Sequence, residues 1–593
     1  MVEANSKENK KENRRSGISL SVFKHILKFV PFLLSLMIVF LALFDFGFDQ
    51  TPKQDLFLRH LYLTFFSLEF IIILIRYISN NRPETKVWAF DAVLLISILF
   101  AISAIAGWRV PSSLFDNSFG DALVIVMIFF REFVPIDYKR KVLNPAQIFM
   151  ISFLLLIFAG TFVLMLPHAT KSGISFIDAL FTSTSAVCVT GLIVVDTGTY
   201  FTIFGQTAVL ILIQLGGIGI ITFTSYFSYF FTGGASYENQ LLIQKMTYSD
   251  KITEVFGSLF KILLLTFLIE GIGAVLIYFS INDTMVASIS EKIFFSVFHA
   301  ISGFCNAGFS TLTDNLYDTN FRFNYLLQLI ITSLLILGGI GFPILFNFSK
   351  YIKHLFVNKV FRKTPIHRPW VININTRIVV VTTALLLIFG TVVFYIFEYN
   401  SVLDGYTGIG KIITAFFSAS TPRTAGFNTI DFATLQTPTI LLVCFLMWVG
   451  ASPGGTGGGI KTSTLAISIM NSINIARGKD RIDFRGREIS GAAVRRAYSQ
   501  IFLSLTAIGL SVLAVELCQD DLDLKAVIFE CISAFSTVGL SLGITAKLCA
   551  ASKLILIFTM FVGRISLLTV LVAFLKQGKA EKFRFPSEDI LIN

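Results

Sequence analysis

Four glycines recur along this strongly apolar chain, each inside a short stretch of small and hydroxylated residues. They are Gly191 in CVTGL, Gly308 in NAGFST, Gly426 in TAGFNT and Gly539 in TVGLS. The intervals between them are about 113 to 118 residues, and each glycine follows a short run rich in Ser, Ala and Phe that is typical of a helix. Such a nearly constant period predicts a structural unit repeated four times.

Four such glycine stretches could carry a cation. A permeating cation must exchange its hydration shell for oxygens, and rings of backbone carbonyls supply them in potassium-selective pores. Turning successive carbonyls inward requires unusual φ values, which glycine adopts without steric cost, and the carbonyl end of a preceding helix favours a cation. The alternative is that each glycine only lets helices pack closely. Four glycines in register after four short helices favour a pseudo-fourfold ring within one chain.

A second glycine-rich segment, GASPGGTGGGIKTST at residues 450–464, follows the third of these stretches. A helix cannot continue stably through its glycines and Pro453, and an unwound segment inside a membrane must line a cavity. We therefore interpret it as a gate below the glycine ring rather than as an ordinary kink. Lys461 within it either repels a cation while the gate is closed or extends to the cytosolic interface, and we weigh these two roles evenly.

The elements that must position these residues are membrane helices. The chain has 593 residues, of which 54% are hydrophobic and 14% charged, and apolar runs long enough to cross ~30 Å of hydrocarbon recur from residue 26 to residue 575. We expect an all-α polytopic membrane protein. The net charge of +11 suggests nucleic-acid binding, but the basic residues lie in the linkers between apolar runs, as the positive-inside rule requires, so we reject nucleic acid as a partner.

Each of the four units is expected to contain a long helix, a short helix, the glycine stretch and a second long helix. The short helices cannot span a membrane and should be re-entrant. The glycines Gly216, Gly338, Gly450 and Gly563 should soften the second long helices at a common depth. The first long helices are predicted over 146–166, 258–279, 377–397 and 498–516; the short ones over 176–187, 291–302, 411–420 and 525–535; the second long ones over 204–230, 325–348, 436–476 and 553–576.

The chain divides accordingly, with both termini cytosolic, twelve crossings and four re-entrant hairpins. The predicted segments are a disordered basic cytosolic tail (1–25), N-terminal transmembrane helices (26–140), pore unit 1 (141–236), a cytosolic linker (237–257), pore unit 2 (258–350), a linker (351–375), pore unit 3 with its gating loop (376–478), a linker (479–496), pore unit 4 (497–577) and a cytosolic tail (578–593).

The N-terminal spans carry ionisable residues, namely Glu69 and Arg76 in one span and Asp91 in the next. Buried ionisable groups in membrane helices are costly and usually face a partner. The pattern loosely resembles the first three helices of a voltage-sensor bundle, but Arg131 is nearly alone in the fourth span, where that family has a regular arginine series. We prefer a peripheral helical bundle with a structural ion pair.

The four glycine stretches, together with GGTGGGIKTST, resemble the Trk/Ktr/HKT superfamily of potassium and sodium translocating subunits over about residues 145–577. The resemblance implies four M1-P-M2 units around one pore, a selectivity filter and an intramembrane gating loop. It also implies a homodimer in the inner (plasma) membrane, bound to a cytosolic nucleotide-binding regulatory ring. Members with serine at the first filter glycine tend towards sodium, so Gly191 implies a potassium-permeable pore. Potassium or sodium ions are then permeant partners, and no catalytic cofactor is expected.

The resemblance also assigns residues. The implied selectivity filter consists of Val189, Thr190, Gly191, Asn306, Ala307, Gly308, Thr424, Ala425, Gly426, Thr537, Val538 and Gly539. The gate consists of Gly454, Gly455, Thr456, Gly457, Gly458, Gly459, Lys461 and Arg564.

Arg564 matches the family's arginine in the last helix, although the ISLL that follows it departs from the family's usual glycine-proline. A buried guanidinium can form an electrostatic barrier while donating to loop carbonyls. The alternative is that Arg564 only pairs with a carboxylate such as Glu516 or Glu530.

Three other polar residues, Asp178, His299 and Glu530, are expected to hydrogen-bond the free backbone groups at the ends of short helices or to bind each other. A role in the charge of the outer vestibule is the less favoured alternative. Cys188 and Cys305 each precede a filter glycine by three residues, which raises the idea of a disulfide across the pore.

We find no enzyme signature, and the glycines at 454–459 lack the spacing of a phosphate-binding loop. Three other functions stay open: a sodium-permeable or sodium-coupled member of the same superfamily, a secondary transporter with broken helices around a midplane site, and a membrane receptor or scaffold without transport. Four hairpins in the same direction favour a pore over the inverted repeat of a transporter.

Overall fold

The computed structural model describes residues 30–78, 85–105, 124, 125, 127, 128, 131, 145–218, 255–282, 288–356, 373–479, 481–484 and 486–575. Several predicted segments lie wholly or mostly outside these residues: the tail 1–25, the linkers 237–257 and 351–375, the fourth N-terminal span, the end of the second long helix beyond residue 218, and the tail 578–593.

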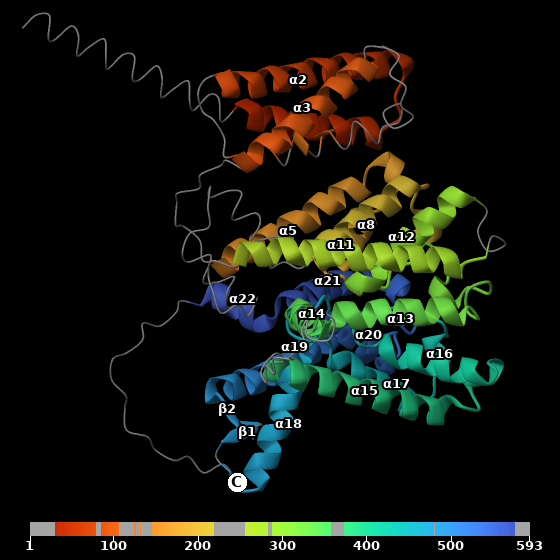
Figure 1. Cartoon of the computed structure of the whole chain (residues 1–593). Coiled ribbons are helices and arrows are strands. Elements are labelled where there is room, and N and C mark those ends of the chain that lie inside the picture. The colour runs from red at the N-terminus through yellow and green to blue at the C-terminus, as the bar shows by residue number, and fades with distance from the viewer. Residues whose placement is uncertain are drawn as a thin grey trace, which may run out of the picture.

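An N-terminal group of helices lies on one side of the molecule, next to α5 and α8 (Figure 1). It comprises the helix Val30–Gly47, α2 (Pro52–Ile78) and α3 (Thr85–Ile105). Its own hydrophobic core includes Ile38, Phe66, Ile73, Leu94 and Ile98, all of which are buried. These helices therefore bury one apolar face among themselves and leave another face outward.

A pattern of a long helix followed by two shorter helices then occurs four times, and the first of the two shorter helices is called the short helix here. Each short helix leads directly into one of the glycine stretches. The twelve helices are α5 (Pro145–Leu164), α6 (Phe176–Val187) and α8 (Ile203–Gly217); α11 (Val255–Ser280), α12 (Ile289–Cys305) and α13 (Tyr325–Ile340); α15 (Ile374–Glu398), α16 (Ile409–Ser420) and α17 (Thr437–Trp448); and α19 (Gly491–Cys518), α20 (Leu524–Ser536) and α21 (Ala550–Ile565).

The short helices begin at hydroxyl caps where the sequence offers them. The Ser175 side chain accepts the backbone N–H of Asp178 at the start of α6, and Ser288 accepts that of Glu291 at the start of α12. Such caps satisfy donors that a helix start leaves without partners. Asn306 and Thr537, the residues directly after α12 and α20, adopt the left-handed conformation, which stops each helix just before its glycine.

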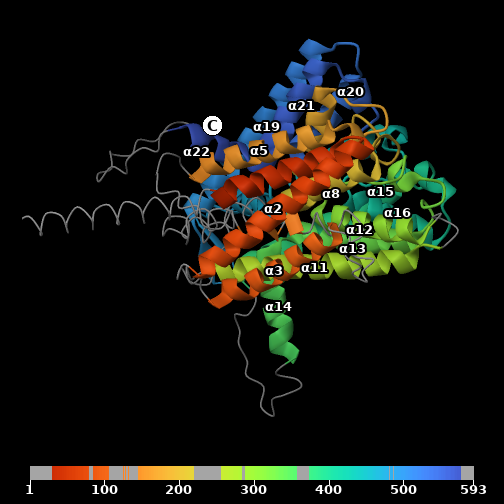
Figure 2. The same ribbon diagram turned by 90° about the horizontal axis from the view of Figure 1, so that it is seen from above.

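The prediction of continuous second long helices over 325–348 and 553–576 was wrong. Between α13 and α14 (Phe342–Phe356) the chain bends by 99°, and Figure 2 shows α14 directed away from the other helices. Here Gly341 has φ +92, and an added Cβ would lie 2.9 Å from both Gly455 N and Pro453 O. Between α21 and α22 (Leu567–Phe574) the break falls at Ser566, whose φ is +76.

The third set breaks over a longer stretch, as predicted for the glycine-rich segment. Residues 449–461 separate α17 from α18 (Thr462–Ala476). A short antiparallel hairpin follows, formed by β1 (Ile482–Phe484) and β2 (Arg487–Ile489). Within the described part of the chain these are the only paired strands, so the expected all-α class holds apart from this hairpin.

Five described helices are long and apolar enough to cross a membrane, or six if the bent pair of α13 and α14 counts as one span. The twelve predicted crossings stay a prediction, because α8, α17 and α21 have 15, 12 and 16 residues, fewer than the ~20 that a straight crossing needs.

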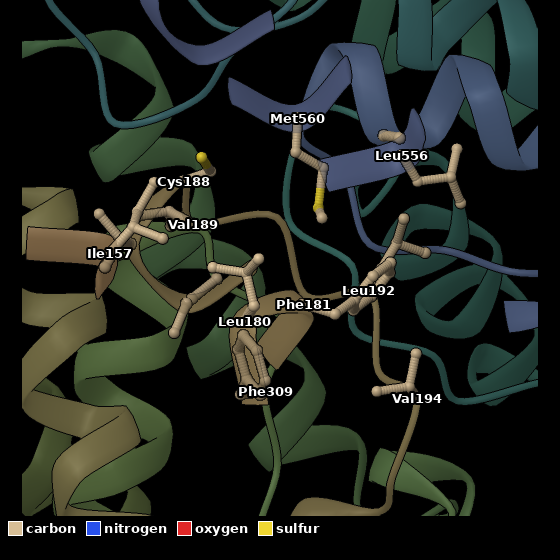
Figure 3. Close-up of a cluster of buried hydrophobic side chains, with 14 of the residues drawn as sticks. Ile157, Leu180, Phe181, Cys188, Val189, Leu192, Val194, Phe309, Leu556 and Met560 are labelled. Carbon is tan, nitrogen blue, oxygen red and sulfur yellow. The ribbon is translucent and has the colours of Figure 1, made fainter. Parts of the chain in front are cut away.

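The ends of the short helices form the centre of the molecule. Figure 3 shows the cluster around the first glycine stretch, in which Cys188, Val189 and Leu192 pack near Leu556 and Met560 of α21. This cluster joins the first and fourth sets of helices, which are far apart in the sequence. The glycine stretches are therefore held by tightly packed apolar side chains rather than exposed as surface loops.

Candidate functional site

The four glycines of the predicted filter meet in one closed ring. The φ angles of Gly191, Gly308, Gly426 and Gly539 are +91, +70, +77 and +91. Each glycine lies so near the next glycine stretch that a Cβ added to it would be less than 3.0 Å from the backbone of that stretch. The nearest atom to this Cβ is a carbonyl oxygen in every case. It belongs to Ala307 for Gly191, to Ala425 for Gly308, to Val538 for Gly426 and to Thr190 for Gly539. Because the last contact returns to the first stretch, the ring closes, and the carbonyl before each glycine is one of its contacts.

The residue two positions before each glycine also has a positive φ. The values are 55 at Val189, 62 at Asn306, 74 at Thr424 and 51 at Thr537. Non-glycine residues rarely adopt this conformation, and it costs of order 1–3 kcal/mol per residue. The surrounding helices therefore hold each stretch in a shape that its sequence alone would not prefer.

Hydroxyl groups at the ends of the short helices hold these stretches from behind. Ser185 Oγ accepts the N–H of Gly191 at 3.1 Å, and Ser533 Oγ accepts that of Gly539 at 3.0 Å. Ser302 Oγ donates to Phe309 O at 2.8 Å and Thr421 Oγ1 to Phe427 O at 2.6 Å. These four residues are not among those predicted from the sequence. A hydroxyl five or six positions before each glycine was the signal that could have identified them.

The three polar residues singled out near the short helices lie at separate places and do not bind each other. His299 is fully buried, with Nε2 2.9 Å from Ser310 Oγ and Nδ1 2.9 Å from Phe295 O. Glu530 accepts a hydrogen bond from Thr545. Asp178 pairs with Lys553 Nζ at 2.6 Å, which joins the starts of α6 and α21.

The glycine-rich loop 450–464, the predicted gate, lies directly against the side chains of Thr424 and Thr537 in the predicted filter. The N–H of Gly458 donates to Thr537 Oγ1 at 3.0 Å, and Gly457 leaves no space for a Cβ beside Thr424 Oγ1. Lys461 donates to the carbonyl oxygens of Gly457 at 2.7 Å and Gly458 at 3.3 Å. The ammonium of Lys461 is therefore held by the loop itself, and the two roles weighed for it stay predictions.

The same loop satisfies the broken end of α13. Ser452 N donates to Gly339 O at 3.0 Å, Thr456 N donates to Gly338 O at 3.2 Å, and Phe342 N donates to Gly454 O at 3.2 Å. A helix end leaves carbonyls without intrahelical partners, and here the loop supplies the donors. The break in α13 and the position of the loop therefore depend on each other.

Arg564 connects the loop to the first set of helices. Its guanidinium donates to Thr456 O in the loop and, at 2.6 Å, to Gly216 O in α8. Among the described residues it forms no ion pair with Glu516 or Glu530, so the carboxylate alternative is not what the structure contains. Arg564 thus reaches across from α21 to two other elements around the ring.

The glycines expected to soften the second long helices lie at the ends of these helices. Three of the helices end one or two residues after Gly216, Gly338 and Gly563, which agrees with the expected softening at a common depth. An added Cβ at these glycines would overlap the backbone carbonyl of Val187, Phe304 or Phe535, respectively, at the end of the short helix of the same set. These three glycines therefore also permit close packing, the alternative that we had set aside for the filter glycines.

Two further predictions concern cysteines and charges. Cys188 and Cys305 are both free thiols, so the disulfide across the pore is absent. In the N-terminal group, Arg131 binds Asp91 through two hydrogen bonds of 3.0 and 3.1 Å, and Tyr77 donates to the same carboxylate at 2.7 Å. This agrees with a structural ion pair, although the side chain of Arg76 lies outside the described residues.

No group of three or more His, Cys, Asp or Glu side chains that could hold a metal ion occurs among the described residues. The glycine ring brings backbone carbonyl oxygens close to one another's stretches, and the hydroxyl oxygens of Thr424 and Thr537 face the neighbouring glycine-rich loop. Such ligands are suited to a weakly held, partly dehydrated monovalent cation.

Comparison with known proteins agrees with this geometry. The TrkH family model, described as "Cation transport protein", matches residues 124–583. The chain belongs to the TrkH family of cation transport proteins. It is therefore a membrane cation transporter, and the resemblance inferred from its motifs is confirmed.

Two curated relatives of this TrkH-family chain are similar over nearly their whole length. The potassium/sodium uptake protein NtpJ of Enterococcus hirae is 35% identical over 461 residues, which covers 76% of this chain and 98% of NtpJ. The Ktr system potassium uptake protein B of Bacillus subtilis is 36% identical over 449 residues, covering 75% and 96%.

A solved structure of the family also matches. The potassium transporter TrkH from Vibrio parahaemolyticus aligns with a TM-score of 0.59 at 16% identity, over 93% of this chain and 98% of that chain. At this identity the match supports the fold.

Proposed function

We propose that this TrkH-family chain is the ion-conducting subunit of a potassium uptake system. The selectivity filter consists of the four glycine stretches, arranged as four M1-P-M2 units around a pseudo-fourfold pore, and the N-terminal helices are an addition outside the pore. The observation that carries this proposal is the closed ring of contacts between the four glycine stretches, in which the carbonyl before each glycine is a contacted group. A carbonyl ring can replace the hydration shell of a cation.

The loop at 450–464 acts as the gate in this proposal. Its support is the contact between the loop and the lower side of the filter, where Gly457 and Gly458 touch Thr424 and Thr537. In this position the loop and the charged groups of Lys461 and Arg564 stand where a cation leaving the filter must pass. Conduction then requires the loop to move.

Potassium preference is supported by Gly191 at the first filter position and by the names of the Ktr relatives. A second candidate, a sodium-permeable or sodium-coupled transporter, is supported by the relative NtpJ, whose name includes both ions. The Ktr names also support a multi-subunit system, which agrees with our proposal of a homodimer on a cytosolic nucleotide-binding ring. We place this assembly in the inner (plasma) membrane, with both termini cytosolic.

Uptake of rubidium and of sodium into liposomes containing the purified protein tests the proposal, with the variant Gly426→Ser beside it. We expect passive flux that prefers rubidium, and a rise in sodium relative to rubidium in the variant. Gly426 leaves no space for a Cβ beside Val538 O, so a serine must displace a neighbouring carbonyl.

The matched control for this experiment is Gly173→Ser. Gly173 also has a positive φ, but a Cβ there meets nothing within 4 Å. The control therefore places a serine at a positive φ, as Gly426→Ser does, without changing the glycine ring. Equal ion ratios for the two variants would reject the filter assignment. Dependence of flux on a sodium or proton gradient would favour a coupled transporter.

A further inference from the structure

Asn315, in the loop after the second glycine stretch, is hydrogen-bonded to a carbonyl of the predicted filter. Its Nδ2 donates to Gly308 O at 3.0 Å, and its Oδ1 accepts the backbone N–H of Leu316 at 2.9 Å. The second bond requires the amide oxygen on that side, so the amide donor must face Gly308. Asn315 is the first residue of η3 (Asn315–Tyr317). A side chain from outside the glycine stretch therefore holds one of its carbonyls.

This contact distinguishes Gly308 from the rest of the predicted filter. Of the twelve residues assigned to the filter, only Gly308 has a carbonyl oxygen that accepts a hydrogen bond from another described residue. The carbonyls of the other three glycines, Gly191, Gly426 and Gly539, accept none within the described part of the chain. Buried carbonyls normally have a donor, so those without one are available to a cation. The four stretches are therefore not equivalent.

The loop that carries Asn315 is fixed from both sides. Nε2 of His299 lies 2.9 Å from Ser310 Oγ, which accepts the N–H of Leu312 at 3.0 Å. On the other side, Leu316 is buried in the core of the second set of helices. Asn315 itself has φ +57, a conformation that asparagine adopts more readily than most residues. A turn needs only that conformation, so the hydrogen bond to the filter is a separate feature.

We propose that Asn315 is a positioning residue that sets the ion preference, because its amide occupies part of the Gly308 carbonyl and leaves three free glycine carbonyls and one shared. This inference rests on the proposed function, in which the filter carbonyls replace the hydration shell of the permeating ion. A carbonyl oxygen has two lone pairs, so Gly308 O keeps one for an ion. The donated N–H, however, places the positive end of a dipole against this oxygen and weakens its attraction for a cation.

The expected consequence is a lower preference for potassium. Selectivity for potassium over sodium depends on the number and the field strength of the coordinating carbonyls. Sodium is the smaller ion and needs fewer oxygens around it, so weakening one carbonyl of four disfavours potassium more than sodium. The amide of Asn315 therefore reduces a preference that four equal carbonyls would produce.

The variants Asn315→Gly and Asn315→Asp remove the donor and keep the turn, since glycine and aspartate both tolerate a positive φ. Aspartate also keeps the acceptor for the N–H of Leu316. We expect the ratio of rubidium to sodium uptake into liposomes to rise about two- to fivefold in both variants, the size of one neutral hydrogen bond.

The matched controls are Asn428→Gly and Asn428→Asp. Asn428 follows the glycine of the third stretch, and its Nδ2 donates to Ile430 O at 3.2 Å, outside the filter. The same substitutions there remove an amide donor, and aspartate adds the same charge, without changing a filter carbonyl. The uptake ratio should stay as in the unaltered protein.

Three results of the uptake experiment would overturn the role of Asn315 and keep the pore. One is an unchanged ratio in both Asn315 variants, and another is an equal change in the Asn315 and Asn428 variants. The third is a fall in the ratio of the Asn315 variants, which would mean that the hydrogen bond only stabilises the filter.

Ion binding in detergent separates this inference from the proposed function. Isothermal titration calorimetry of the full-length protein with rubidium chloride and sodium chloride measures relative affinity without transport. We expect the affinity for rubidium relative to sodium to rise in Asn315→Gly and to stay unchanged in Asn428→Gly. This result in a protein without flux would reject the pore and retain the role of Asn315. Flux in the unaltered protein, with equal relative affinities in the two glycine variants, would retain the pore and reject that role.

Discussion

At the scale of single residues, the contact between Thr537 and the loop 450–464 connects the proposed filter to the proposed gate. The hydroxyl oxygen of Thr537 accepts the N–H of Gly458, and the left-handed conformation of Thr537 directs the chain so that its side chain meets the loop. One residue therefore contributes both to the shape of the filter and to the closed position of the loop.

The variant Thr537→Val should shift the loop towards its open position. Valine has the shape of threonine but cannot accept the Gly458 N–H, and a buried unpaired donor costs roughly 1–3 kcal/mol. The open population and the rubidium flux should rise roughly tenfold. Thr537→Ser keeps the acceptor and should resemble the unaltered protein. Flux that falls equally in both variants would indicate damage to the filter instead of release of the loop.

At the scale of elements, the loop is the point where separate helices meet. It bonds to the end of α13 through Ser452, to α21 through Arg564, and to the end of α20 through Thr537. Movement of the loop must break several of these hydrogen bonds at once. Such shared contacts produce two discrete positions rather than a gradual opening.

Deletion of residues 454–458 should raise flux without any regulatory partner. The deletion removes the part of the loop that touches Thr424 and Thr537, together with the carbonyl that Arg564 binds. Rubidium uptake by the deletion variant is compared with that of the unaltered protein, after gel filtration has shown that both fold. A folded variant that is silent, or whose flux is unaltered, would contradict the gate.

A second element-scale contact joins the helix Val30–Gly47 to η1 (Pro167–Ala169), which follows α5. Nε2 of His168 lies 2.6 Å from the Asp49 carboxylate, and Nδ1 lies 3.0 Å from Phe46 O. The hydrogen bond to Asp49 raises the pKa of His168 above its ordinary value, with a smaller contribution from Phe46. Only protonated histidine can donate to both acceptors at once.

This contact should weaken as pH rises. Because the folded protein raises the pKa of His168, its stabilisation is complete below the ordinary histidine pKa, about 6.5, and is lost as pH rises through the higher pKa of the folded protein. We expect faster amide exchange around Phe46 at about pH 8.5 than at about pH 5.5, after correction for intrinsic rates. The effect should be small, because the Asp49 side chain is 96% exposed. Asp49→Asn should abolish it, and a pH dependence retained in that variant would exclude this pair as its cause.

At the scale of the whole molecule, the N-terminal helices have their own core and lie to one side of the four helix sets. Their buried ion pair between Asp91 and Arg131 lies within this group, and the contacts that close the glycine ring come from residues after 145. These contacts separate most of the N-terminal group from the candidate ion path, while the family match begins at residue 124 and so includes Arg131.

Removal of residues 1–140 should therefore leave conduction in a protein that still folds. Rubidium uptake by the truncated chain is measured beside that of the full chain, with gel filtration and melting temperature as measures of folding. Loss of flux from a folded truncation would show that the N-terminal group takes part in transport.

The sequence by itself determined the repeat, the class and the family, because these depend on local composition and spacing. The short helix expected over 176–187 has those bounds in the structure, since apolar content, a serine cap and a following glycine are local signals. The family also followed from five spaced motifs.

Only the tertiary structure decided which groups meet. Four stretches more than a hundred residues apart in the chain close one ring, and the contact of Arg564 with α8 and the 99° bend after α13 each depend on partners distant in sequence. In the sequence alone, a glycine that only permits a positive φ, such as Gly173, looks the same as one that permits close approach to another backbone, such as Gly563. The physical reason is that a helix break or a buried charge is stable only where another element supplies its hydrogen bonds, and that element is chosen by packing.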